Sequence, residues 1–150
     1  MDTPATKDIV IDAWKAFATR DAARIEAVFT EDAQWHAPPG NATALALGYT
    51  EHVLDRATIV RFLSRQLATL FVADVKSTPV SLVAEGPVAV LETRFQGTLA
   101  NGRRYDNDYC FVIEVRDGRI RRIREYMDTQ RGFRCIFGER SEPRVLVPSP

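Results

Sequence analysis

The sequence predicts an α+β fold in which helices pack on one face of a mostly antiparallel sheet. Apolar residues recur at helical spacing in the first half of the chain, and from residue 75 onward polar and apolar residues alternate as they do in strands. Two dipeptides typical of tight hairpins, Asn101-Gly102 and Asp117-Gly118, divide this second half. The length of 150 residues suits a single domain over residues 1–150, with its core over about residues 6–129.

Three helices are expected before the main run of strands. The first spans about residues 6–19 and has an apolar stripe that starts at Ile9. Asp21 is expected to cap a second, short helix that carries apolar residues as far as Phe29. The third helix spans about residues 56–71 and has a wide apolar face. Together these helices are expected to cover the concave side of the sheet.

The strands are expected at regular intervals. A first strand, Ala33–Ala37, is stopped by Pro38-Pro39-Gly40 because proline does not continue a central strand. Residues 41–55 are expected to form a long loop, which in a small domain is often functional or mobile. Four further strands are expected over residues 75–84, 88–99, 105–115 and 119–128.

The residues after the last strand form a tail over positions 130–150. Phe133, Ile136 and Phe137 are expected to form a short segment that closes the mouth of a pocket. From Gly138 onward the repeated prolines predict a loosely held end.

Polar side chains on the buried face of the last hairpin predict a pocket. The expected inner face carries Asn107, Tyr109 and Glu125 among the apolar residues Phe111, Ile113 and Met127. A dry core excludes an amide and a carboxylate unless each is hydrogen-bonded, whereas the wall of a ligand pocket accepts them. The plainer alternative is an ordinary core whose polar groups have satisfied partners.

Composition bears on partners and cofactors. Lys plus Arg and Asp plus Glu each total 20, so the formal net charge is zero and nothing favours nucleic acid or an anionic membrane. No apolar run approaches the ~18 residues needed to span a membrane, and the N-terminal residues do not resemble a signal peptide. Two cysteines without a disulfide or metal pattern favour the reducing cytoplasm. The sequence has two histidines and no metal-binding motif, so we expect no metal site. It has no Gly-rich phosphate loop after a strand, so we expect no nucleotide cofactor.

Three stretches resemble the NTF2-like superfamily, and in detail its SnoaL-like branch, which is related to ketosteroid isomerases. They are WKAFATRDAARIEAVFTEDAQWHAP, ATIVRFL and NGRRYDNDYCFVIEVRDGRIRRIREYMDT. The resemblance implies a cone in which a curved antiparallel or mixed sheet and three N-terminal helices enclose one pocket. It also implies a homodimer through the convex sheet face. The superfamily includes isomerases, polyketide cyclases, epoxide hydrolases, dehydratases and non-catalytic binding modules, so the fold alone does not choose a reaction.

The resemblance argues against ketosteroid isomerase activity. In those enzymes a general-base Asp follows the first strand, a Tyr lies on the first helix and a second acid lies on a later strand. The matching positions here are Ala37, Ala13 and Cys110, so all three roles are absent. The thiol of Cys110 is expected to lie on the outer sheet face.

The resemblance to epoxide hydrolases of this fold supplies the catalytic candidates Glu125, Arg94 and Glu92. Their Arg-x-Asp pair matches Arg94 and Glu92 in reversed order, their last acid matches Glu125, and their Tyr and Asn match Trp35 and Ala37. Two carboxylates beside one guanidinium suit proton abstraction next to a carbonyl. Glu125 would act as acid or base with Arg94 as its electrostatic partner, and either Arg94 or Tyr109 would stabilise the enolate. The alternative is a structural Glu–Arg–Glu network. A one-residue slip in register would move Glu92 and Arg94 to the outer face.

Aromatic and apolar residues of the expected inner surfaces are the substrate-binding candidates. They are Trp14, Phe17, Trp35, Phe62, Asn107, Tyr109, Phe111 and Met127. His36 follows Trp35 directly on a strand and therefore faces the other way. His52 lies in the expected loop, where it could act as a base in a lid, although a lone histidine in a loop is usually solvated.

The outer face of the hairpin is expected to form the dimer surface. Val112, Ile120 and Tyr126 would be its apolar centre, among charged residues that form cross-strand ion pairs. Three functions stay open: a cofactor-free cyclase, isomerase or dehydratase acting on a small apolar carbonyl metabolite, a non-catalytic binding module, and a structural dimerisation domain. The first two need an open pocket, and the third needs a filled one.

Overall fold

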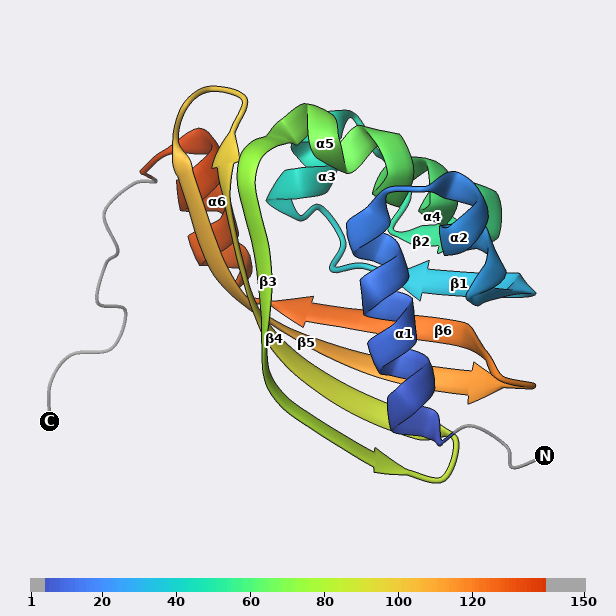
Figure 1. Ribbon diagram of the computed structural model, residues 1–150. Coiled ribbons are helices and arrows are strands. Elements are labelled where there is room, and N and C mark those ends of the chain that lie inside the picture. Colours follow the sequence, from blue (N-terminus) through green and yellow to red (C-terminus); the bar gives the residue numbers. More distant parts are fainter. Residues whose placement is uncertain (1–4, 140–150) are drawn as a thin grey trace, which may run out of the picture.

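The computed structural model describes residues 5–139 and contains one curved, six-stranded mixed sheet with the strand order β2-β1-β6-β5-β4-β3 (Figure 1). The strands are β1 (Phe29–His36), β2 (Val53–Asp55), β3 (Phe71–Glu85), β4 (Val88–Leu99), β5 (Arg104–Arg116) and β6 (Arg119–Met127). The helices are α1 (Thr6–Thr19), α2 (Ala22–Ala27), α3 (Ala42–Leu47), α4 (Arg56–Arg61), the π-helical turn η1 (Phe62–Gln66), α5 (Leu67–Leu70) and α6 (Thr129–Phe137). The predicted α+β class is confirmed.

Helices cover one side of the sheet. Figure 1 shows α1 lying along the inner face, with α2 and α4 toward the β1–β2 side, α5 leading into β3, and α6 at the opposite end. Helix α1 has the predicted bounds, and it buries Val10 and Ala13 completely. Asp21 caps α2, as expected, because its carboxylate accepts a hydrogen bond from the Arg24 N–H. The chain enters β1 at Phe29, four residues earlier than predicted.

The loop predicted over residues 41–55 is wrong, because this segment contains α3 and the short strand β2. Asn41 caps α3 by accepting a hydrogen bond from the Ala44 N–H at 3.0 Å. Gly48 ends the helix with a φ of 76°, a conformation that favours glycine. Strand β2 then pairs antiparallel with β1. The segment is thereby attached to the edge of the sheet, next to β1.

The predicted third helix is present as a composite of α4, η1 and α5. Asp55 caps its start by accepting a hydrogen bond from the Thr58 N–H. Within it, η1 forms a wider turn in which the Leu67 N–H donates to the carbonyl of Phe62. Such π-helical turns are rare and occur often at functional sites. Phe62 and Leu63, two residues of this wider turn, line the cavity described below.

The registers of β4, β5 and β6 place Glu92 and Arg94 on the outer face, so the predicted inward orientation is wrong. Glu92 lies opposite Cys110, and Cys110 lies opposite Tyr126, whose side chain is 56% exposed. Directly paired residues share a face of the sheet, so this whole row faces outward. The inner row next to it contains Leu91, Phe111 and Glu125.

The outward placement of Ile120 is also wrong. The ladder between β5 and β6 is irregular between Glu114 and Val115, so that Val115 lies opposite Ile120 and Glu114 opposite Arg122. A bulge of this kind reverses the alternation at one point in the strand. As a result Ile120 is completely buried in the main core and takes no part in the outer surface.

Two apolar clusters fill the interior. The larger lies between α1, α2, α4 and the sheet, and includes Phe29, Ile113 and Ile123. The smaller contains Phe71 and Tyr105 and is covered by α6 through Ile136. Helix α6 therefore closes this second cluster, and the prediction that it closes the pocket mouth is wrong. The loosely held end predicted beyond it falls on residues 140–150, outside the described residues.

Candidate functional site

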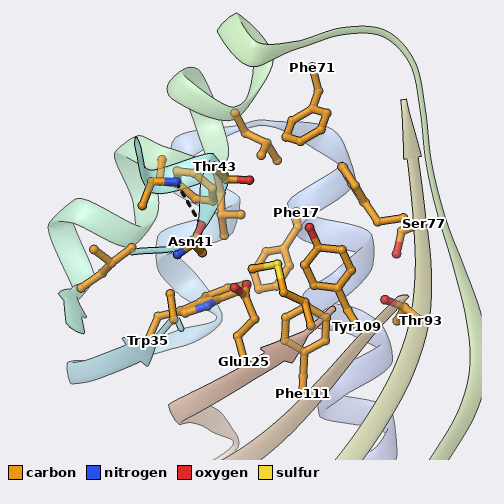
Figure 2. A pocket seen from close by; sticks show the side chains of 18 of the residues that line it. Phe17, Trp35, Asn41, Thr43, Phe71, Ser77, Thr93, Tyr109, Phe111 and Glu125 are labelled. Atoms are coloured by element: carbon orange, nitrogen blue, oxygen red, sulfur yellow. Dashed lines mark hydrogen bonds between the residues drawn. The ribbon is translucent and has the colours of Figure 1, made fainter. Parts of the chain in front are cut away.

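A cavity of about 290 Å³ lies between α1, the α4–η1–α5 helix, α3 and the inner face of the sheet (Figure 2). Ligand pockets commonly measure about 300–1,000 Å³, and an engineered cavity of about 150 Å³ holds benzene. The volume therefore suits a compound of about two rings. Seven of the eight predicted binding residues line it: Trp14, Phe17, Trp35, Phe62, Tyr109, Phe111 and Met127.

Asn107, the eighth predicted residue, is completely buried next to the cavity but does not line it. Its amide nitrogen donates to the hydroxyl of Tyr105 at 3.2 Å and to the carbonyl of Asp128 at 2.9 Å. Its amide oxygen accepts from the Asp108 N–H at 2.9 Å. The Asn107 amide is therefore satisfied by protein partners. At this position the alternative of an ordinary core with hydrogen-bonded polar groups describes the structure.

Glu92 and Arg94, two of the three catalytic candidates, are outside the cavity. Glu92 is exposed and accepts a hydrogen bond from the Ser81 hydroxyl at 3.1 Å. Arg94 forms a two-pronged ion pair with Asp106, donating from Nε to Oδ1 at 2.8 Å and from Nη2 to Oδ2 at 2.5 Å. Neither residue can touch a ligand in the cavity, so the predicted Glu–Arg–Glu site does not form.

The cavity wall is mainly aromatic. The Phe111 ring stacks on Tyr109 with centroids 5.8 Å apart, and it meets Trp14 and Trp35 edge-on at 5.1 and 5.8 Å. Phe17 extends this surface through a tilted contact with Trp14. Offset and edge-to-face contacts of this kind hold aromatic rings in fixed positions. The wall is therefore a rigid apolar surface, shaped for a flat or compact apolar ligand.

Glu125 projects from β6 into this aromatic surface. Burial raises the pKa of its carboxyl from 4.5 to about 7, although a hydrogen bond from Trp35 lowers that pKa in part. Figure 2 shows the carboxyl next to the indole nitrogen of Trp35. Glu125 has no ion-pair partner among residues 5–139. A carboxyl with a pKa near 7 is present in both protonation states at neutral pH, which suits a general acid or base.

A second polar group, the Tyr109 hydroxyl, faces the same cavity. It lies 2.5 Å from the hydroxyl of Tyr105, a side chain that is completely buried. Burial raises the pKa of both phenols, so both keep their protons at neutral pH. Tyr109 and Glu125 come from neighbouring strands and are offset by one inward-facing position, since Tyr109 lies opposite Met127 and Phe111 opposite Glu125.

Several lining residues were missed from the sequence. Thr93 and Phe95 come from β4, and the alternation that places Leu91 inward also places them inward. Helix α3 supplies Thr43 and Ala44, which the prediction of a loop concealed. Two further charged side chains, Arg20 and Glu51, also line the cavity. The cap sequence beginning at Asn41 was the signal that could have revealed α3.

Neither histidine lines the cavity. His36 lies next to Gln34, with Nε2 and Oε1 3.1 Å apart, and partial burial together with the charge of Arg122 lowers its pKa. His52 is exposed. Within residues 5–139, no group of three or more His, Cys, Asp or Glu side chains is arranged to hold a metal ion. No helix in that range is long and apolar enough to cross a membrane.

Comparison with known proteins places this cone and its cavity in a family. Residues 10–123 match the model of the SnoaL-like domain, which is most of the chain. The chain belongs to the SnoaL-like family. This family has the NTF2-like fold and includes polyketide cyclases and isomerases. No curated protein matches the sequence.

Solved structures support the same fold for this SnoaL-like protein. An NTF2-like protein of unknown function from Burkholderia pseudomallei is 20% identical, with a TM-score of 0.75 and coverage of 91% of this chain and 99% of the other. TerC, co-crystallised with polyporic acid, is 20% identical, with a TM-score of 0.71 and coverage of 87% and 97%. A protein with a ketosteroid isomerase-like fold from Catenulispora acidiphila, in complex with trimethylamine, is 14% identical, with a TM-score of 0.67 and coverage of 88% and 94%. At these identities the likeness concerns the fold alone.

Proposed function

We propose that this SnoaL-like protein is a cofactor-free enzyme that moves a proton on a small apolar carbonyl compound. The observation that carries the proposal is the carboxyl of Glu125, which lies in an aromatic cavity, has no ion-pair partner within residues 5–139 and has a pKa of about 7. An ionisable group costs free energy in such surroundings, and perturbed groups of this kind are concentrated at functional sites. Isomerisation, cyclisation and dehydration by proton transfer all need a group that can take up and release a proton at neutral pH, and the Glu125 carboxyl is such a group.

The proposed reaction begins with the ionised form of Glu125. Its carboxylate removes a proton from the carbon next to the ligand carbonyl, and the electrons of the C–H bond form an enolate. The Tyr109 hydroxyl stabilises the developing negative charge on the carbonyl oxygen by a hydrogen bond. The protonated Glu125 then returns the proton at another carbon, which gives the isomer. In a cyclisation, the enolate carbon attacks a second carbonyl carbon of the same molecule, the π electrons of that carbonyl move to its oxygen, and this oxygen takes the proton from Glu125. Arg94 and Tyr109 were the two residues predicted to stabilise the enolate, and of these Tyr109 lines the cavity.

A solved structure of this fold supports an aromatic ligand for the cavity. TerC was co-crystallised with polyporic acid, so a protein of this fold accommodates that compound. The aromatic wall around Phe111 offers an apolar surface for a ligand with rings.

We also propose a homodimer in the cytoplasm. The outer sheet face carries a continuous apolar row, since Val83 pairs with Val90 and Val90 with Val112, and Val83 is 58% exposed. Exposed Tyr126 lies in the neighbouring row. A second copy packed on this face would cover these side chains. The two free cysteines fit a reducing compartment.

A binding module without turnover is the second candidate. The observation that favours it is that Glu125 has no second buried acid beside it to share in proton transfer. The other acidic residue that lines the cavity, Glu51, is exposed. Binding alone needs the aromatic wall and the Tyr109 hydroxyl. It does not need the carboxyl of Glu125 to ionise.

Native mass spectrometry of freshly purified protein, with gentle release of bound molecules, tests the proposal. We expect a dimer that carries a small carbonyl compound. The released compound is then returned to the wild type and to Glu125→Gln, and conversion by the wild type alone supports the enzyme. A released compound that binds both forms and is converted by neither supports the binding module. A monomer contradicts the proposed dimer surface.

A further inference from the structure

We infer that Tyr109 is an obligate hydrogen-bond donor to the ligand, and that its proton is aimed into the cavity by Asn107 and Tyr105. The ligand class is thereby narrowed to compounds whose oxygen at this point accepts a hydrogen bond, such as a ketone, a quinone or an enolate. The inference deepens the proposed function and rests on it for the presence of a carbonyl ligand. It assigns positioning roles to two residues that do not touch the cavity.

The orientation of the Asn107 amide starts the chain of hydrogen bonds. Its oxygen lies 2.9 Å from the Asp108 N–H, and its nitrogen lies 2.9 Å from the carbonyl oxygen of Asp128. A flipped amide would place donor against donor and acceptor against acceptor at these two contacts. The nitrogen therefore has its second proton left for the hydroxyl of Tyr105, 3.2 Å away.

The Tyr105 hydroxyl has only one direction in which to donate. It accepts from Asn107, and its side chain is completely buried. Among residues 5–139 its other hydrogen-bond partner is the hydroxyl of Tyr109 at 2.5 Å. If Tyr109 donated to Tyr105, the Tyr105 proton would be buried without an acceptor, which is strongly unfavourable. Tyr105 therefore donates to Tyr109.

The proton of Tyr109 is consequently free for the cavity. Its oxygen is occupied by the Tyr105 proton, and no other described residue makes a hydrogen bond with it. Figure 2 shows the hydroxyl of Tyr109 at the cavity, on the same side as the carboxyl of Glu125. A carbonyl oxygen bound to Tyr109 would bring its neighbouring carbon toward Glu125, because the two residues are diagonal neighbours on paired strands.

Helix α6 holds this chain of hydrogen bonds in place. Gly132 of α6 packs directly over it: a Cβ at this position would lie 3.3 Å from both the Asn107 amide nitrogen and the Tyr105 hydroxyl. Glycine lowers helix stability relative to alanine, so it is unfavourable in a helix unless the backbone needs the space. Its presence here allows the helix backbone to approach the buried polar pair. Asp128, the N-cap residue of the same helix, supplies the carbonyl that orients Asn107.

A matched pair of ligands tests the inference on the full chain. The probes are 2-tetralone, which has a ketone, and tetralin, which has the same two rings and no oxygen. Binding is followed through the fluorescence of Trp14 and Trp35, both of which line the cavity. The variants are Tyr109→Phe and Tyr105→Phe, and Tyr126→Phe serves as the control because Tyr126 is exposed on the outer sheet face and does not line the cavity.

We expect Tyr109→Phe to weaken 2-tetralone binding by about tenfold and to leave tetralin within about twofold. Tyr105→Phe is expected to weaken 2-tetralone by about threefold with no effect on tetralin, a selectivity that a merely structural role would not produce. The infrared carbonyl stretch of bound 2-tetralone should lie at lower frequency in the wild type than in Tyr109→Phe, with Tyr105→Phe between them.

Three results overturn the inference: 2-tetralone does not bind the wild type, Tyr109→Phe affects both probes alike, or the carbonyl stretch is the same in the wild type and Tyr109→Phe. Failure of the proposed proton transfer is distinct from these. It leaves the ketone selectivity and the carbonyl shift intact while α-proton exchange of the bound ketone is missing.

Discussion

Replacing Glu125 by glutamine should remove a large pH dependence of stability. Burial raises the pKa of this carboxyl in the folded protein to about 7 from 4.5, the value expected in the unfolded chain. The folded state therefore holds the proton more tightly. The contribution of the protonated Glu125 to the free energy of unfolding is fully present below about pH 4.5. It decreases as the pH rises and is lost above about pH 7.

The size of the effect follows from the two pKa values. At about 1.4 kcal/mol per pH unit, the difference between 4.5 and about 7 corresponds to about 3 kcal/mol. Between about pH 5 and about pH 8 the expected loss is about 2.5 kcal/mol, because part of the change has already occurred at pH 5. The amide of Glu125→Gln is close in size to the protonated carboxyl and does not titrate, so this loss should be missing from the variant.

Urea unfolding at about pH 5 and about pH 8 measures the effect. The free-energy difference between the wild type and Glu125→Gln should change by about 2.5 kcal/mol between the two conditions, in favour of the variant at the higher pH. Glu92→Gln, at an exposed position outside the cavity, controls for the removal of one carboxylate. Parallel pH profiles for wild type and Glu125→Gln would refute a raised pKa at Glu125.

Three further outcomes are expected. Trp35→Phe removes the hydrogen bond that lowers the pKa of Glu125, so a ¹³C NMR titration of the Glu125 carboxyl should give a value above 7; an unchanged value would exclude that hydrogen bond. Arg94→Met breaks the outer-face pair with Asp106 and should leave 2-tetralone affinity within about twofold in a fluorescence titration, whereas a large loss would place Arg94 near the ligand. Ile123→Ala should lower the free energy of urea unfolding by about 2–5 kcal/mol, because Ile123 is completely buried; a loss below about 1 kcal/mol would contradict that packing.

The sheet and its inner face were largely predictable because strand alternation is a strong local signal. The period of two correctly placed Tyr109, Phe111 and Glu125 on one surface. The same period on β4 places Leu91 and Phe95 inward and so Arg94 outward. The family resemblance predicted that Glu92 and Arg94 point inward. The strand alternation predicts the outward orientation that the structure has, in which neither charge is buried.

Short elements and irregular pairing were not predictable in the same way. Helix α3 has six residues, too few for a helical period to stand out, and β2 has three. The irregularity beside Glu114 moves Ile120 from the outer face to the core, and only the paired strand reveals it. One hydrogen bond that fixes the Asn107 amide is made to Asp128, 21 residues away, so the sequence indicated a buried polar group without its role.

The most direct test of the central claim is the exchange of α-protons of 2-tetralone for deuterium in heavy water, followed by ¹H NMR at neutral pH. The claim predicts that the wild type accelerates this exchange above the rate in buffer alone, that Glu125→Gln loses the acceleration, and that Glu92→Gln retains it. Bound 2-tetralone that exchanges no faster than it does in buffer would contradict proton transfer by Glu125.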